Sequence, residues 1–497
     1  MNAVVDKVKQ SFNQKVAQNT EKKSLYFLLY EAIKGSILNA DLPAEIQLSP
    51  SRILAEELSV SRSTVLKAYE LLSLEGYITS LVGSGYKVKA INASLADERP
   101  SVNPDIQYPE LSLMGKSFMQ NVGQLNTTDD KSIAFRPGLP PLDIFPVNQW
   151  KNLANSYWRY IKSSALSYSP SSGNEQLKKS LATYLNLSRG IKCESSQIII
   201  VSGSLQSLYI MGSVLMNPGD TILVENPTFP NVKSIFSSLR ANMIGVGVDQ
   251  EGIRLEEMES QAHKKAKLMH VTPSNHYPKG IRMSLKRRHE LLEWAQKNNS
   301  FIIENDYEHE VNNFSDALPS LFSMDKNQRT VFLGTFNRLL HPSIRIGYMV
   351  VPPYLLEAVE SLLKHSHRFV APSIQVVLNQ FIEKKYIYSH IKKVVEVAEA
   401  RKKVFVDEYE ALLGNKMPLQ MTGVKSLHLL ASIPRGNQDQ ALCNQLAKKH
   451  LLAHAYSKCF IGESKEQGLI FGYSSVRTPV VRRKVQRMAE ILKSKNW

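Results

Sequence analysis

The spacing of apolar residues predicts three helices near the start of the chain. The first spans residues 24–38 and has one apolar face, made by Leu25, Leu28, Leu29, Ala32, Ile33 and Ile37. The second begins after an N-cap at Ser51, and the third begins after an N-cap at Ser61. Short strand-like runs at residues 77–79 and 86–88 enclose a glycine-containing turn and predict a hairpin. Two short helices with a tight turn, followed by a hairpin, predict a winged helix-turn-helix.

The polar start of the third helix is the candidate nucleic-acid surface. Arg62, Ser63, Thr64 and Lys67 face away from its apolar side. The first turn of such a helix can reach base edges and phosphates in a major groove. The alternative interpretation is that residues 61–64 are only a polar helix start.

Strand-length apolar runs alternate with helical patterns from Phe135 onward. The predicted strands are residues 198–201, 222–224, 243–248, 268–271, 301–303, 331–333 and 347–351. This alternation predicts an α/β domain with a mainly parallel sheet. Strands at residues 427–430 and 469–473 predict a smaller C-terminal α+β domain.

Length, composition and charge define the domain organisation. A chain of 497 residues is too long for one ordinary core. Residues 91–132 lose their periodicity and contain several prolines, so we expect a reader domain at 1–92, a linker at 93–130 and a second domain at 131–497. The net charge is +16, but residues 1–100 hold 12 Lys and Arg against 11 Asp and Glu. Bulk charge therefore supports nucleic-acid binding only weakly.

The sequence gives no signal for a membrane or a metal. No apolar run has signal-peptide flanks or the length of a membrane span. Cys193, Cys443 and Cys459 are scattered without metal-ligand spacing. We expect a cytoplasmic protein with no metal site.

The reader segment resembles the DNA-binding domain of the GntR family over roughly residues 24–90. Residues 48–78 carry the resemblance and read L-S-P-S-R-I-L-A-E-E-L-S-V-S-R-S-T-V-L-K-A-Y-E-L-L-S-L-E-G-Y-I, with Ser49-Pro50 where the family usually has Pro-Ser. The resemblance implies that the chain binds double-stranded DNA. The implied contact residues are Arg52, Arg62, Ser63, Thr64 and Lys67, with the wing glycines Gly83 and Gly85 near the DNA backbone.

Residues 333–350 read L-G-T-F-N-R-L-L-H-P-S-I-R-I-G-Y-M-V and carry a second resemblance. They are similar to the lysine-bearing segment of aspartate-aminotransferase-like (fold type I) domains, and more narrowly to that segment in MocR-type regulators of the GntR superfamily. The resemblance implies a pocket for pyridoxal phosphate (PLP) and a homodimer, because Tyr168 is in the position of a tyrosine that reaches the neighbouring subunit's cofactor. The other implied pocket residues are Ser204, Phe229, Asn305, Tyr307, Thr335, Arg338 and Arg345.

Two of these positions depart from the family pattern. Arg338 is in the place of the lysine that forms the Schiff base, and a guanidinium is protonated at any working pH. Asn305 is in the place of the aspartate that keeps the pyridine nitrogen protonated, and the neighbouring Asp306 should point to the other face of its strand. In a looser alignment, Ile470 replaces an arginine that holds a substrate carboxylate.

These observations predict a MocR/GntR-type transcriptional regulator with no catalytic residues. Its aminotransferase-like domain would dimerise and sense an unknown small-molecule effector, without PLP as a Schiff base. The alternatives are a PLP-dependent aminotransferase with an appended DNA reader, and a regulator that binds PLP non-covalently.

Overall fold

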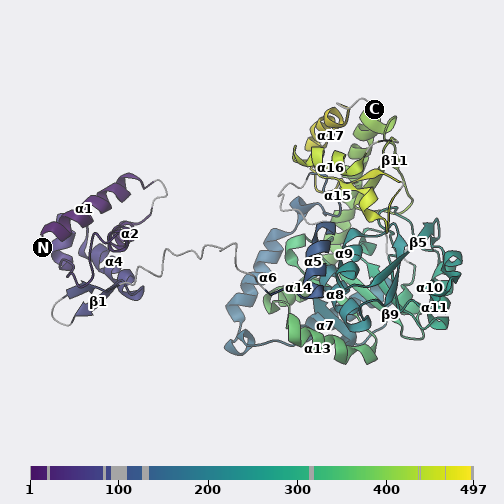
Figure 1. The fold of residues 1–497 in the computed structure, drawn as a ribbon, viewed down its shortest axis with the longest axis horizontal. Coiled ribbons are helices and arrows are strands. Elements are labelled where there is room, and N and C mark those ends of the chain that lie inside the picture. Colours follow the sequence, from purple (N-terminus) through teal and green to yellow (C-terminus); the bar gives the residue numbers. More distant parts are fainter. Residues whose placement is uncertain are drawn as a thin grey trace. The chain divides into compact units, whose positions relative to one another are not determined.

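A computed structural model describes residues 2–19, 23–81, 85–90, 109–125, 134–312, 318–434, 436, 438–464 and 466–493. The chain divides into two compact units, Met1–Pro109 and Glu110–Trp497 (Figure 1). Across the described ranges we find no helix with the length and apolar character that crossing a membrane requires.

The first unit is the predicted winged helix-turn-helix with one additional helix. Its elements are α1 (Asn2–Ala17), α2 (Leu25–Leu38), α3 (Ser51–Glu57), α4 (Arg62–Leu74), β1 (Ile78–Leu81) and β2 (Gly85–Val88). The antiparallel pairing of β1 with β2 forms the wing. Helix α1 was not predicted, and it packs on α2 by burying Val4, Val5, Val8 and Phe12 in the core of the unit.

The structure confirms one predicted helix cap and corrects the other. Ser61 is the N-cap of α4, and its hydroxyl accepts from the Thr64 backbone N–H at 3.2 Å. The prediction of Ser51 as N-cap of α3 was wrong, because Pro50 holds that position and Ser51 is the first helical residue. The Ser51 hydroxyl instead accepts a hydrogen bond from Arg62 Nε at 3.3 Å.

The second unit contains the predicted α/β domain. Its large sheet consists of β3 (Ile198–Val201), β4 (Thr221–Asn226), β5 (Asn242–Asp249), β6 (Gly252–Ile253), β7 (Leu268–Val271), β8 (Phe301–Asp306), β9 (Thr330–Thr335) and β10 (Gly347–Val350). The order across the sheet is β3-β10-β9-β8-β7-β4-β5-β6. Neighbouring strands from β9 to β5 are parallel, whereas β10 and β6 are antiparallel to their neighbours.

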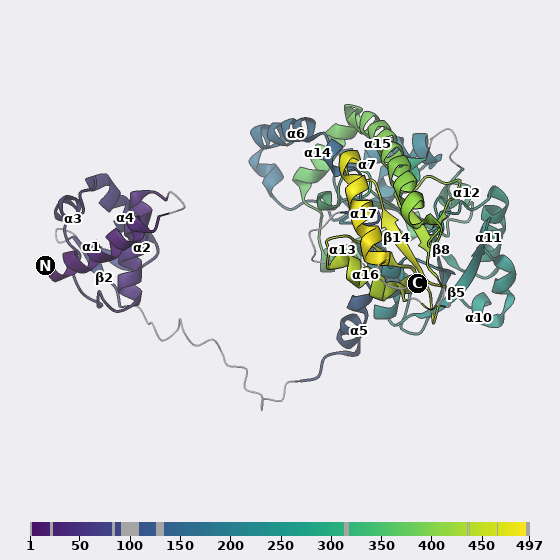
Figure 2. The same cartoon turned by 90° about the horizontal axis from the view of Figure 1, so that it is seen from above.

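Helices cover both faces of this sheet (Figure 2). The helices are α6 (Val147–Tyr160), α7 (Glu175–Arg189), α8 (Ser204–Leu215), α9 (Pro230–Ser238), α10 (Gln261–Lys264), α11 (Leu285–Lys297), α12 (Leu321–Met324), α13 (Leu356–Ser366) and α14 (Pro372–Glu383). Ile198 and Ile200 pack with residues of α7 and α14, while Ile199 and Val201 pack with residues of α8, α9 and α13. This alternation explains why buried strands read as continuous apolar runs.

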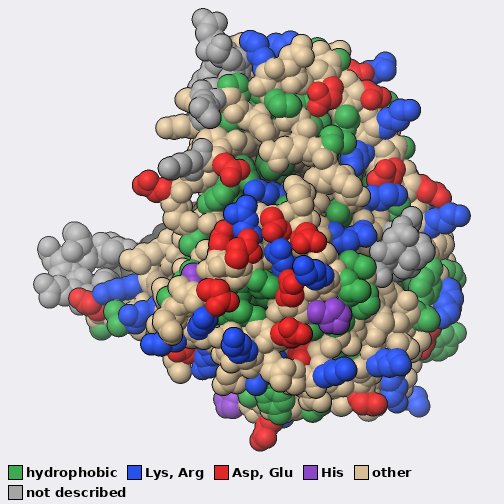
Figure 3. All heavy atoms as spheres, turned by 90° about the vertical axis from the view of Figure 1, so that its right-hand side faces the viewer, with side chains coloured by type: hydrophobic (Ala, Val, Ile, Leu, Met, Phe, Trp, Pro, Cys, Tyr) green, Lys and Arg blue, Asp and Glu red, His purple; other side chains and the backbone are tan. Residues whose placement is uncertain are grey.

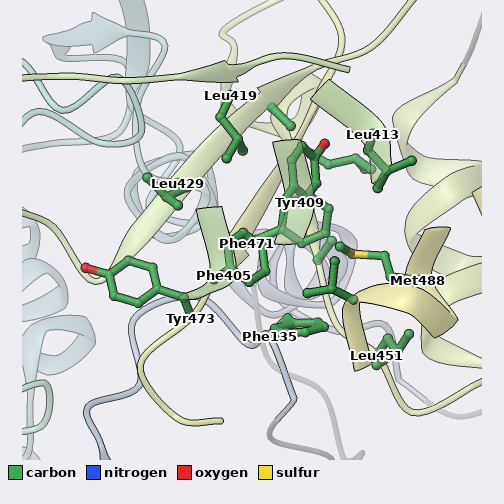
Figure 4. Close-up of a cluster of buried hydrophobic side chains, with 14 of the residues drawn as sticks. Phe135, Phe405, Tyr409, Leu413, Leu419, Leu429, Leu451, Phe471, Tyr473 and Met488 are labelled. Atoms are coloured by element: carbon green, nitrogen blue, oxygen red, sulfur yellow. The ribbon is translucent and has the colours of Figure 1, made fainter. Parts of the chain in front are cut away.

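A smaller domain completes the second unit. Its four-stranded antiparallel sheet has the order β11 (Leu419–Gln420), β12 (His428–Ser432), β14 (Gly468–Gly472) and β13 (His454–Ala455). Helices α15 (Tyr386–Tyr409), α16 (Asp439–Ala447) and α17 (Thr478–Lys493) pack against it. Figure 4 shows its core, where Phe405, Tyr409 and Phe471 lie together. Phe135, which precedes the large sheet in the chain, packs in the same core. Two predicted strands, at 427–430 and 469–473, are confirmed here within one or two residues.

Part of the predicted linker is helical. Helix α5 (Leu113–Asn121) packs on α9, where Ser117 Oγ donates to Ser237 O at 3.1 Å and Ser234 Oγ donates to Asn121 O at 2.9 Å. These hydrogen bonds place α5 in the second unit. The domain limits at 92 and 130 remain predictions, since both positions lie outside the described residues.

Candidate nucleic-acid and ligand sites

The start of α4 presents a row of exposed polar side chains. Arg62, Ser63 and Lys67 are exposed, as is Arg52 on α3. Thr64 is partly buried, and its hydroxyl lies 2.8 Å from Ser61 Oγ. Among the described residues, no carboxylate pairs with either arginine. The two guanidiniums are therefore available to phosphates or base edges.

The wing follows α4 directly in the chain. Gly85 begins β2 and has a φ of +91°, a conformation that side chains other than glycine's rarely adopt. Lys87 on this strand forms an ion pair with Glu45. Gly83, the other predicted wing glycine, lies outside the described residues.

In the second unit, Arg338 lies against two of the predicted ring-binding side chains. Its guanidinium carbon lies 5.2 Å from the ring centre of Phe229 and 4.7 Å from that of Tyr307. Arg338 Nη1 donates to Glu308 Oε1 at 2.6 Å. Gly138 has a φ of +76°, and a Cβ added there would lie too close to the same guanidinium, so both the backbone and the packing favour glycine. Three separate segments, at Gly138, at Phe229 and at Tyr307-Glu308, thus enclose the Arg338 side chain.

Glu308 connects Arg338 to the smaller domain. Its side chain is fully buried, and Oε2 accepts from Asn275 Nδ2 at 3.2 Å, from Ser426 Oγ at 3.1 Å and from the Leu427 N–H at 3.2 Å. The sequence analysis did not single out Glu308. The only signal was an acidic residue directly after Tyr307 at the end of a predicted strand.

Aromatic rings and neutral imidazoles surround this ion pair. The ring centres of Phe229 and Tyr277 are 4.2 Å apart, and the Tyr307 hydroxyl donates to Asn275 O at 2.9 Å. His428 packs on Tyr277 with 4.9 Å between ring centres, and burial lowers the pKa of His428 to about 4. His428 is therefore uncharged near neutral pH, which leaves Arg338 and Glu308 as the charged pair among these groups.

Asn305 and Asp306, adjacent on β8, have different partners. Asn305 Nδ2 donates to His270 Nε2 at 3.2 Å, and burial lowers the pKa of His270 to about 3. Asp306 forms an ion pair with Arg189 at 2.7 Å and accepts from Ser274 Oγ at 3.1 Å. The partners of Asp306 are therefore different from the partner of Asn305.

The predicted phosphate residues divide into two groups. Thr335 Oγ1 accepts from the Asn337 N–H at 3.2 Å, and Ser204 is the first residue of α8 after Gly203, whose φ is +126°. Arg345 is exposed and instead lines a separate cavity. Tyr168 is 80% exposed. The structure therefore gathers Phe229, Tyr307 and Arg338, but places Arg345 and Tyr168 at the surface.

The basic excess of the chain is not gathered into one patch on the face shown in Figure 3. There, Lys and Arg side chains lie interspersed with Asp and Glu. This mixture agrees with the conclusion that the net charge supports nucleic-acid binding only weakly.

Comparisons with known proteins agree with both halves of the architecture. Residues 25–88 match the gntR family of bacterial regulatory proteins, and residues 138–464 match the aminotransferase class I and II family. The chain is 30% identical over 454 residues to the probable rhizopine catabolism regulatory protein MocR of Rhizobium meliloti, covering 91% of each chain. It is also 30% identical to the uncharacterized HTH-type transcriptional regulator YhdI of Bacillus subtilis (strain 168), covering 94% of this chain and 95% of that protein.

The solved structures show the fold of the second unit. The α-aminoadipate aminotransferase LysN of Thermus thermophilus superposes with a TM-score of 0.68 at 20% identity, covering 77% of this chain and 99% of that one. At this identity the likeness establishes the aminotransferase fold alone.

Proposed function

Because the chain belongs to the aminotransferase class I and II family and is a MocR-type, gntR-family helix-turn-helix transcriptional regulator, we propose that its aminotransferase-like domain dimerises and senses an effector without covalent PLP. The reader would bind an operator in double-stranded DNA. The aminotransferase-like domain would carry no transaminase activity. The fold itself implies a capacity for PLP, so the proposal depends on the residues at the site.

The contacts of Arg338 carry this proposal. A guanidinium has no free amine to form a Schiff base, and this one is hydrogen-bonded to Glu308 at 2.6 Å. It also lies against the rings of Phe229 and Tyr307, where a pyridine ring would stack. Asn305 offers an amide bonded to a neutral imidazole rather than a carboxylate. These residues do not fit PLP held as a Schiff base.

Exposed apolar side chains support a dimer of the second unit. Trp158, Tyr160, Leu166 and Tyr168 are 59%, 73%, 65% and 80% exposed and lie within one short stretch of chain. Exposed apolar side chains that gather on a surface typically mark a protein interface. Because the resemblance gives Tyr168 the position of a tyrosine that reaches the neighbouring subunit, we expect the partner at this surface to be a second copy of the chain.

Non-covalent PLP binding is the second candidate. Ser204 begins helix α8, whose first N–H groups can bind a phosphate, and Thr335 offers a hydroxyl. Equilibrium dialysis of the unmodified protein against PLP tests this candidate. Retained PLP without a visible absorption band would favour it over an effector site that excludes PLP.

A mobility-shift assay tests the main proposal. The full chain should retard DNA from the region upstream of its own gene, and excess unrelated duplex should not compete. Arg62→Ala should weaken the shift, whereas Arg240→Ala, an exposed arginine of the second unit, should not. Equal retardation of operator and unrelated DNA by the parent would refute an operator-specific reader.

A further inference from the structure

Leu66 presents an apolar side chain on the exposed side of α4. The core of the reader contains other apolar side chains of this helix, namely Val65, Ala68, Tyr69 and Leu72. Leu66, by contrast, is 38% exposed. Because an α-helix turns once in about 3.6 residues, Leu66 lies one turn after Arg62 and on the same side of the helix. An apolar side chain thus lies next to an arginine that we expect to contact DNA.

The exposed side chains of residues 62–70 form the outward face of α4. At about 100° per residue, they follow one another around the helix in the order Arg62, Leu66, Glu70, Ser63 and Lys67. The two cations therefore lie at the edges of this face, with Leu66 between them. In a major groove the phosphates of the two strands form the borders and the base edges form the floor. Cations at the edges of the face suit phosphates, and a side chain between them faces bases.

Other helices of the reader hold the cations at both edges of this face. Arg62 Nε donates to Ser51 Oγ of α3 at 3.3 Å. Lys67 Nζ lies 5.6 Å from the ring centre of Tyr26 of α2, which is a cation–π contact. Arg62 is thus directed towards α3 and Lys67 towards α2, and the Leu66 side chain remains exposed on the part of α4 between them.

The thymine methyl is the group on base edges that a leucine can recognise. A leucine side chain has no hydrogen-bond donor or acceptor, whereas base edges in the major groove present donors, acceptors and the 5-methyl group of thymine. Covering this methyl with another apolar group removes both from water, which is favourable. Leu66 is therefore suited to distinguish a base pair that carries the methyl from one that lacks it.

We propose that Leu66 is a specificity-determining residue of the reader and packs on the 5-methyl group of a thymine in the operator. This assignment rests on the proposed binding of an operator by the reader and adds the base that one side chain recognises. Lys67, at the edge of the face, contributes to affinity for any duplex, because phosphate contacts carry no sequence information. Leu66 contributes to operator binding alone.

Uracil substitution in the operator tests the inference at the level of one methyl group. Footprinting of the full chain on DNA upstream of its own gene first locates the protected site. Each thymine of that site is then replaced in turn by deoxyuridine, which lacks the 5-methyl group and pairs with adenine in the same way. Fluorescence anisotropy of labelled duplexes gives the Kd of each. At the contacted thymine, we expect the substitution to raise the parent's Kd roughly threefold to tenfold, as the loss of one buried methyl contact predicts.

Three variants decide whether Leu66 makes the methyl contact. Leu66→Ala should bind the thymine and uracil operators equally at the position that affects the parent, because its side chain ends at Cβ. Leu66→Met keeps an apolar side chain of similar volume and should keep most of the difference. Leu38→Ala is the matched control, since Leu38 is 47% exposed at the end of α2, and it should leave the parent's ratio of Kd values unchanged. Both leucines are exposed, so the melting temperatures of the variants should stay close to the parent's.

Two results would overturn this inference alone. One is a parent that binds its operator specifically and tolerates uracil at every thymine. The other is a sensitive thymine that remains equally sensitive in Leu66→Ala, which would assign the methyl contact to a different side chain. Both results leave operator binding by the reader intact. Equal retardation of operator and unrelated DNA by the parent would instead overturn the proposed function and this inference together, so the two failures are distinguishable.

Discussion

Replacing Glu308 by glutamine should destabilise the second unit by about 2–3 kcal/mol. Glu308 is fully buried, and the Arg338 side chain is only 17% exposed. Removing one partner of a buried ion pair leaves the other charge unpaired and typically costs about 3–5 kcal/mol. The expected cost is at or below the low end of that range, because water still reaches Arg338 and the carbonyl of the introduced glutamine would remain an acceptor.

Urea unfolding followed by tryptophan fluorescence measures this change. All four tryptophans of the sequence follow residue 109, so the signal reports the second unit. The control is Glu490→Gln, which removes an exposed ion pair with Arg487 at 3.0 Å. Exposed pairs contribute about 0–1 kcal/mol, so the control should lie close to the parent.

A double-mutant cycle with Arg338→Met separates the pair from its surroundings. If Arg338 and Glu308 stabilise each other across their 2.6 Å contact, the coupling energy should be about 1–3 kcal/mol. A Glu308→Gln variant as stable as the parent, or a coupling below about 0.5 kcal/mol, would show that Arg338 does not depend on Glu308.

Three further predictions concern the reader, the dimer and pH. Arg62→Ala should weaken operator binding by about 1–3 kcal/mol, with a smaller loss for Lys67→Ala, and unchanged mobility shifts would contradict the placement of α4. Residues 131–497 should sediment as a dimer, and a monomer at micromolar concentration would refute a shared interface that includes Tyr168. Burial raises the pKa of Glu225 to about 7 from 4.5, so the folded chain retains a proton that the unfolded chain releases, and stability should fall as pH rises across this window. Glu225→Gln should remove this pH-dependent loss of stability, which is roughly 3 kcal/mol. Urea unfolding of the parent and the variant between pH 5 and 8 measures the effect, and parallel curves of stability against pH would refute the prediction.

Local patterns predicted most of the elements in both units. The cap at Ser61 and the strand at 198–201 follow from capping chemistry and from continuous apolar runs, and the structure has both. Helix α1 was missed because it is marginal by itself and gains its stability by packing on α2. The antiparallel placement of β10 was also missed, since strand order depends on connections that periodicity does not encode.

The candidate site was predicted less completely than the fold. The resemblance identified Phe229, Tyr307 and Arg338, and the structure brings these three together. It did not indicate Glu308, whose partner is 30 positions away in sequence and meets it only where a strand end approaches a loop. The pairing of Arg368 with Tyr168 likewise joins segments 200 residues apart. Such contacts arise from tertiary structure and leave no pattern in a single sequence.

The absorbance spectrum of the purified protein mixed with PLP tests the central claim most directly. A Schiff base between PLP and a lysine absorbs in the visible, whereas free PLP and a guanidinium do not form that band. The unmodified chain should give no protein-dependent visible band and no transamination, and Arg338→Lys should acquire the band without turnover because Asn305 is still an amide. A visible band or turnover with the unmodified chain would contradict the account.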